Sequence, residues 1–177
     1  MKKTLLVVSL LFAFLSNAQE KQVYLQDVDK KHEVKINALM LISAEWIDVS
    51  YEYLIDSESS FGSSFTVDLT NNTTLDYAIT PYYRRYFSGK FARGFFVEGF
   101  GSLFSAESGS IFDDSRDNPS ETGFALGIAV GGKFVTSGGF TTELLYGVGR
   151  NVANGNADVL ESNEFFPRVG ISVGYRF

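Results

Sequence analysis

The chain contains no cysteine, and it has only three prolines, one tryptophan and one histidine. Without cysteine it has no disulfides, no thiolate metal ligands and no site for lipid attachment after export. A single histidine argues against a transition-metal cluster. Acidic residues outnumber basic ones, and the formal charge of −6 argues against nucleic acid as a partner. We therefore expect no cofactor.

The first residues have the pattern of a secretory signal. Lys2 and Lys3 precede an apolar run over 5–15, and Ser16 and Ala18 are small residues at the two positions that determine cleavage. A membrane anchor is the alternative, but the run is shorter than the roughly 20 residues of a spanning helix. We expect residues 1–18 to be removed, and the loss of two lysines takes the charge from −6 to −8.

The rest of the chain is rich in phenylalanine, tyrosine and glycine and contains no second apolar run of spanning length, which indicates β-structure. Apolar and polar residues alternate with a period of two in eight segments, each about long enough to cross a bilayer as a tilted strand. An even number of strands is typical of bacterial outer-membrane barrels. The segments cover about 34–42, 46–55, 61–69, 76–87, 94–104, 123–134, 140–148 and 165–177.

The last segment has the pattern of a terminal transmembrane strand. Ile171, Val173, Tyr175 and Phe177 alternate with small or charged residues, and the chain ends on an aromatic residue. We expect Val173, Tyr175 and Phe177 to form the signal that the outer-membrane insertion machinery recognises. Taken alone, the pattern also fits the edge strand of a soluble sheet.

The lengths of the connections fit a barrel that has its N-terminus in the periplasm, in which short turns follow even-numbered strands and longer loops follow odd-numbered ones. The connections after the second, fourth and sixth segments are short, at 56–60, 88–93 and 135–138, whereas those after the fifth and seventh are long, at 105–121 and 150–163. The first two outer connections, 43–45 and 70–74, are expected to be short as well. The polar residues 19–32 form a periplasmic leader, and 33–177 form one barrel domain.

Alternation alone does not say which face is inside, and a soluble lipocalin-like barrel with an apolar cavity is the alternative. Five charges of each sign fall on the polar face, a balance that allows pairing in a narrow lumen. With the aromatic strand ends, this favours polar side chains inside an eight-stranded antiparallel transmembrane barrel. The predicted lumen charges are Lys35, Arg84, Lys133, Arg168 and Arg176, with Asp48, Glu52, Asp68, Glu98 and Glu143.

Five runs resemble the small outer-membrane β-barrels of Bacteroidetes-type Gram-negative bacteria. They are KINAL at 35–39, YEY at 51–53, ITPYYRRYF at 79–87, GFFVEG at 94–99 and VGISVGYRF at 169–177. The architecture is similar to that of OmpX and the OmpA membrane domain. The resemblance implies a closed barrel in the outer membrane that is inserted through its last strand, in a family that largely lacks an assigned biochemistry.

Residues with catalytic chemistry are few. Some eight-stranded barrels modify lipid A, but His32 is expected to lie before the first strand on the periplasmic side, so we predict no enzyme. Glu52, Arg84 and Glu98 fall in one layer of the lumen, where they form either a structural ion-pair network or a gate for solutes.

A cluster of acidic residues marks the longest outer connection. It comprises Asp113, Asp114, Asp117 and Glu121, without the spacing of a calcium-binding loop. We expect a solvated loop that contacts lipopolysaccharide through divalent ions, and partner contacts through 105–121 and 150–163. The sequence thus favours a structural or interaction role in the outer membrane. A narrow passive pore is the alternative, and a lipid A-modifying enzyme is the less favoured one.

Overall fold

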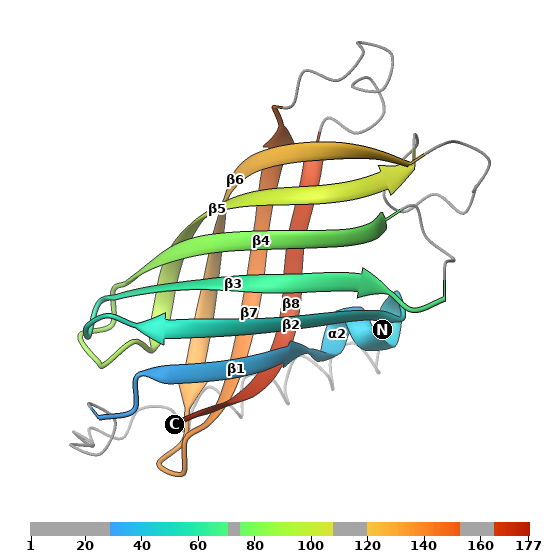
Figure 1. Ribbon diagram of the computed structural model, residues 1–177. Helices are drawn as coiled ribbons and strands as arrows, with labels where there is room; N and C mark the ends of the chain where they lie inside the picture. Colours follow the sequence, from blue (N-terminus) through green and yellow to red (C-terminus); the bar gives the residue numbers. More distant parts are fainter. Residues whose placement is uncertain (1–28, 71–74, 108–119, 153–164) are drawn as a thin grey trace, which may run out of the picture.

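The computed structural model describes residues 29–70, 75–107, 120–152 and 165–177, and it confirms an all-β barrel of eight antiparallel strands (Figure 1). Each strand pairs with the next, and β8 pairs with β1 to close the ring. The strands are β1 His32–Asn37, β2 Trp46–Leu54, β3 Ser59–Asp68, β4 Leu75–Tyr86, β5 Gly94–Glu107, β6 Ser120–Val135, β7 Phe140–Asn151 and β8 Phe165–Arg176.

Polar and apolar residues, which alternate along each predicted strand, lie on the inner and outer faces of the barrel wall. In β4, Tyr82 and Arg84 are buried inside, whereas Ile79 and Tyr83 are exposed outside. The expected register of β5 is also confirmed, because Glu98 is fully buried. The lumen is therefore the polar and charged side, and the outer surface is apolar, which rules out the lipocalin-like arrangement.

Glycines of β6 accommodate phenylalanines of β5 in the lumen. Gly123, Gly127 and Gly131 lie directly opposite three phenylalanines that also recur every fourth residue, Phe104, Phe100 and Phe96. A Cβ atom on any of these three glycines would lie 2.4 Å from the Cζ atom of the facing ring. The rings therefore occupy the space that larger residues on β6 would take, and this packing fills the lumen of a narrow barrel.

The connections divide the barrel into a turn end and a loop end. At the turn end lie 55–58, 87–93 and 136–139. At the opposite end, the loop end, β3, β5 and β7 finish at Asp68, Glu107 and Asn151, and α2 follows β1. In the first turn the backbone amide of Glu58 donates to Asp56 Oδ1 at 2.7 Å. This hydrogen bond, with one from Ser59, lowers the pKa of Asp56.

The prediction of a strand over 34–42 is wrong in its second half. The chain leaves the sheet after Asn37 and forms a short helix, α2 Ala38–Ser43. Asn37 accepts a hydrogen bond from the Met40 amide as the N-cap, and Ala, Leu and Met are strong helix formers. Apolar residues occupy positions 38–42 without a polar alternation, so the period of two ends at Asn37.

Other boundaries also differ from expectation. Residues 105–107, 120–121 and 150–151, expected in the outer connections, continue β5, β6 and β7. His32, expected in the leader, is the first residue of β1. Residues 1–28, with the predicted signal, lie outside the described residues. Among the residues that are described, no helix has the length and apolar character to span a membrane.

Candidate functional site: a charged cluster in the lumen

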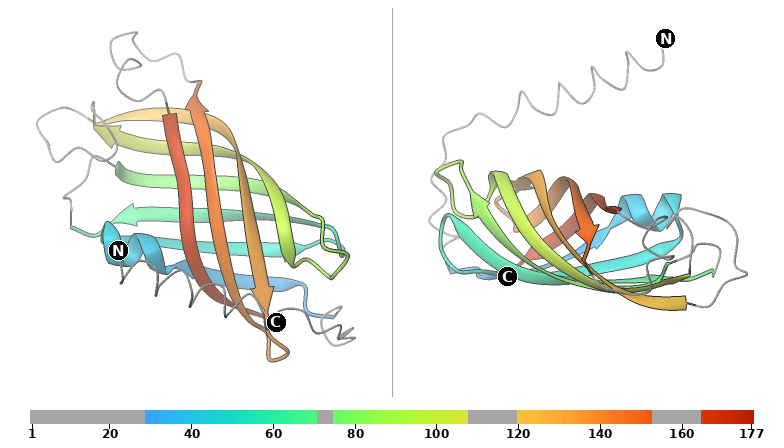
Figure 2. Two further views of the ribbon diagram at one scale, coloured as in Figure 1. Left: turned by 180° about the vertical axis from the view of Figure 1, so that it is seen from behind. Right: turned by 90° about the horizontal axis from the view of Figure 1, so that it is seen from above.

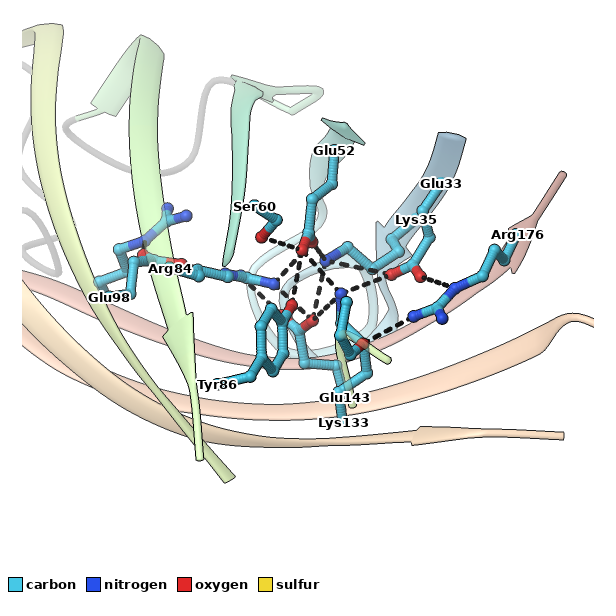
Figure 3. A network of polar contacts seen from close by, with 12 residues as sticks. Glu33, Lys35, Glu52, Ser60, Arg84, Tyr86, Glu98, Lys133, Glu143 and Arg176 are labelled. Atoms are coloured by element: carbon cyan, nitrogen blue, oxygen red, sulfur yellow. Dashed lines mark hydrogen bonds and ion pairs between the residues drawn. The ribbon is translucent and has the colours of Figure 1, made fainter. Parts of the chain in front are cut away.

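Buried charges from seven strands meet in the middle of the barrel (Figure 3). Glu52 on β2 lies at the centre. Its Oε2 atom accepts from Lys35 Nζ at 2.6 Å and from Arg84 Nη1 at 2.8 Å. Its Oε1 atom accepts from Lys133 Nζ at 2.8 Å, and from Ser60 and Tyr86 at 2.6 Å each. Both oxygens of this fully buried carboxylate are therefore satisfied, as a buried charge requires.

Arg84 on β4 links the remaining acidic residues. Its Nη1 and Nη2 atoms donate to the two oxygens of Glu143 at 2.7 and 2.8 Å, and its Nε atom donates to Glu98 at 2.6 Å. The guanidinium carbon lies 4.4 Å from the ring centroids of Tyr82 and Phe96. This planar fork, held by three carboxylates and two rings, has the bidentate geometry that arginine makes and lysine does not.

Two further arginines extend the cluster in opposite directions. Arg168 on β8 donates from Nε to Glu98 at 2.5 Å and from Nη1 to Ser64 at 3.2 Å. Toward the turn end, Arg176 donates from Nε to Glu33 at 3.1 Å, and Glu33 also pairs with Lys133 at 2.9 Å. The ion pairs thus run along the lumen from Arg168, the fourth residue of β8, to Arg176 at the C-terminal end of the same strand.

The structure brings eight of the ten predicted lumen charges into this cluster. Asp48 and Asp68 lie nearer the loop end: Asp48 accepts from Asn37 Nδ2 at 2.9 Å, and Asp68 accepts from the Thr70 amide at 2.8 Å. Glu33 is a member that the sequence did not predict, because the first strand was expected to begin at Val34, whereas it begins at His32. Its spacing from Lys35, with Val34 between them, is the signal that extends the alternation back to Glu33.

Three carboxylates of the cluster are close enough to suggest a metal site. Glu33, Glu52 and Glu143 offer oxygens that lie within 4.8 Å of one another. However, the ammonium group of Lys35 contacts Glu52 and Glu143, and that of Lys133 contacts Glu33 and Glu52. A metal ion would have to displace these ammonium groups. The arrangement therefore satisfies buried charges within the chain and does not present open ligands.

A small cavity lies on the loop side of the cluster. It has a volume of about 60 Å³, which is enough to hold water. Arg84 and Glu143 lie at its inner end, with Arg168 beside them, and Trp46 and Leu75 come from strand ends at the loop end. The cluster separates this cavity from the turn end of the lumen.

The remaining predicted site residues take separate places. His32 packs against Phe177 and hydrogen-bonds the hydroxyl of Tyr51 at 2.6 Å at the turn end. Tyr175 and Phe177 are exposed on the outer wall, and Val173 is half-buried. Glu121 is in β6, whereas Asp113, Asp114 and Asp117 lie outside the described residues.

Comparisons with known proteins do not extend these findings. A scan against protein-family models, a search of curated proteins and a search of solved structures each returned no match to this chain.

Proposed function

We propose that the chain is an outer-membrane β-barrel with a closed lumen, and that its role is structural or interactive rather than conductive. In this proposal, the barrel holds its outer loops at the cell surface and contacts lipopolysaccharide there. The observation that carries it is an apolar wall around a lumen whose middle is crossed by paired, buried charges.

The outer wall carries exposed apolar side chains on every strand. Ile128 is 68% exposed and Tyr146 is 72% exposed, and so much apolar surface in water is unfavourable. Lipid would cover it. Examples from β1 to β8 in order are Val34, Tyr51, Phe65, Ile79, Val97, Ile128, Tyr146 and Ile171.

Exposed aromatic residues gather at the turn end, as expected of the girdle that marks a membrane interface. They are Phe61, Tyr83, Phe87, Phe95, Phe140, Tyr175 and Phe177. Together with the predicted signal over 1–18 and the resemblance to small outer-membrane barrels, this girdle supports placing the turn end at the periplasmic face.

A closed lumen follows from the cluster rather than from the strand number alone. Eight strands leave an interior just wide enough for side chains. The interior here holds Arg84 and Glu52, which are 1% and 0% exposed and bound to each other. An ion that crossed the lumen would have to break several of these pairs, so the narrow-pore alternative is disfavoured.

The experiment is a planar-bilayer recording of residues 19–177 refolded in lipid, with folding checked by heat-modifiable gel mobility. We expect a folded barrel without discrete conductance steps. Discrete steps that change in size in Glu98→Ala would contradict the proposal and favour the pore. If the mass spectra of lipid A are the same with and without the protein, the lipid-modifying alternative is contradicted.

A further inference from the structure

The cavity on the loop side of the charged cluster brings together an acidic and a basic residue that do not pair with each other. β8 runs along the wall opposite β2, β3 and β4, as the front and back views show (Figure 1 and Figure 2). Asp48 of β2 and Arg168 of β8 both line the cavity. Among the described residues, the carboxylate of Asp48 bonds only to the Asn37 side chain, and Arg168 pairs with Glu98. Two opposite charges therefore face one cavity without forming an ion pair.

Arg168 has one side-chain nitrogen that no residue of the barrel uses. Its Nε atom donates to Glu98 at 2.5 Å and its Nη1 atom donates to Ser64 at 3.2 Å, whereas its Nη2 atom has no hydrogen-bond partner among the described residues. The side chain is only 10% exposed, and the guanidinium carbon lies 5.2 Å from the ring centroids of Tyr82 and Phe100. Because these contacts hold the guanidinium in place, Nη2 is a positioned donor for the carboxylate of a ligand.

Asp48 offers the complementary acceptor. Its Oδ2 atom accepts from Asn37 Nδ2 at 2.9 Å, and the same nitrogen donates to the Val169 carbonyl at 3.1 Å. Asn37 thereby holds the Asp48 carboxylate beside the part of β8 that carries Arg168. In the part of the chain that the structure describes, the Oδ1 atom of Asp48 has no hydrogen-bond partner and the carboxylate has no cation within ion-pair distance. An ammonium group at this position would therefore be stabilised.

The charges on the cavity wall disfavour a simple ion of either sign. An anion at Arg168 would share the cavity with Asp48 and Glu143, and a cation at Asp48 would share it with Arg168 and Arg84. A neutral molecule that carries one charge of each sign is complementary to both sides of the wall. The volume of about 60 Å³ restricts this molecule to a very small one. A short zwitterion meets both requirements.

We propose that this cavity binds the zwitterion of a small α-amino acid, such as glycine. The ammonium group donates to Asp48 Oδ1, and the carboxylate accepts from Arg168 Nη2. The hydroxyl groups of Ser50 and Thr66, which also belong to residues that line the cavity, provide further polar partners. The inference goes beyond the proposed function and does not rest on it, because the cavity lies inside the barrel whichever medium surrounds the wall.

The single tryptophan provides the measurement. Trp46 lines the cavity, and as the only tryptophan of the chain it gives one indole N–H signal in the NMR spectrum of the isotope-labelled protein. The protein is refolded in a neutral alkyl-maltoside detergent and titrated with glycine, acetate or methylammonium at constant ionic strength. We expect a saturable shift with glycine, and a dissociation constant about tenfold or more below that of either single-charge ligand. No saturable shift, or equal affinity for glycine and a single-charge ligand, would overturn the inference.

Two variants each remove one charge and predict opposite changes in selectivity. Asp48→Asn should weaken glycine about tenfold without weakening acetate, because only the ammonium group loses its partner. Arg168→Met should weaken glycine about tenfold without weakening methylammonium. The matched control is Asp76→Asn, since Asp76 lies at the loop end of β4, accepts from Ser105 at 3.0 Å and is outside the cavity wall. It should bind glycine as the wild type does.

The folding of each variant is checked first, by heat-modifiable gel mobility without ligand. Wild-type affinity for glycine in both Asp48→Asn and Arg168→Met would overturn the inference, as would an equal loss of all three ligands in a folded variant. If Arg168→Met fails to fold, Asp48→Asn and the comparison of the three ligands still decide. Discrete conductance steps would contradict the proposed function, whereas a silent, folded barrel without a glycine-dependent shift would contradict the amino-acid site alone.

Discussion

At the scale of single residues, strand alternation gives two adjacent arginines opposite environments. Arg84 is 1% exposed and pairs with three glutamates in the lumen. The next residue, Arg85, lies on the outer face and pairs with Glu58, with about half of each side chain exposed. A buried pair that loses one partner leaves an uncompensated charge, whereas a solvated pair contributes little.

We therefore predict that Arg84→Ala lowers the free energy of unfolding by about 3–5 kcal/mol, because it leaves Glu52, Glu98 and Glu143 short of a cation. Urea unfolding of the barrel in lipid, followed by gel mobility, measures the loss. Arg85→Ala is the matched control and should change the free energy by less than about 1 kcal/mol. Equal effects of the two variants would show that the cluster does not stabilise the barrel.

At the scale of elements, the facing phenylalanines and glycines of β5 and β6 make a packing that is sensitive to one added carbon. We predict that Gly123→Ala destabilises the barrel by about 1–3 kcal/mol, because its Cβ atom would lie 2.4 Å from the Phe104 ring. Adding Phe104→Leu should restore part of the loss. Gly99→Ala, which meets nothing within 4 Å, is the control. A loss in Gly123→Ala that Phe104→Leu does not reduce would point to a backbone effect instead.

The helix α2 depends on Asn37 for its start and for its attachment to β8. Replacing Asn37 with alanine removes the N-cap, at a cost of about 1 kcal/mol, and the bonds to Ile171 and Val169. We predict faster hydrogen exchange of the Met40 and Ile171 amides in Asn37→Ala, measured by mass spectrometry.

The control for this prediction lies at the other end of the same helix. Ser43 donates to the Leu39 carbonyl at 2.7 Å, and it is exposed. Ser43→Ala should leave the exchange of the Ile171 amide unchanged. If Asn37→Ala and Ser43→Ala had the same effect on that amide, the attachment of α2 to β8 through Asn37 would be wrong.

At the scale of the whole molecule, the ring closes through its two ends. Phe177 donates its amide to the His32 carbonyl at 2.8 Å and accepts from the His32 amide at 3.0 Å, and the two rings stack with centroids 5.8 Å apart. Deleting Phe177 removes these contacts as well as the predicted insertion signal. We predict that most of the protein then fails to appear as a heat-modifiable band in the outer-membrane fraction.

Phe165→Ala changes an exposed phenylalanine at the other end of the same strand and serves as the control. It should assemble as well as the wild type, because it leaves the contacts between Phe177 and His32 in place. Normal assembly after deletion of Phe177 would contradict an insertion mechanism that depends on the last residue.

Much of the fold could be predicted from the alternation of polar and apolar residues, because a strand in a barrel wall has one apolar and one polar face. The number of strands, their faces and the inward direction of Arg84 and Glu98 could all be derived in this way. The first strand was predicted less well. The alternation of polar and apolar residues does not mark where a strand begins or ends, so Glu33 was left out of the strand and residues 38–42 were included.

By itself, then, the sequence determined an eight-stranded barrel with charges inside, since a one-residue shift of any strand would turn its charges outward. Only the tertiary structure decided which charges meet, because pairs such as Lys35 with Glu143 and Glu98 with Arg168 come from strands that are not neighbours. Contacts across a lumen depend on strand tilt and side-chain reach, which no spacing along the chain encodes. The same holds for Asn37, since its side chain can bond the backbone of Val169 and Ile171 only where β8 lies beside it.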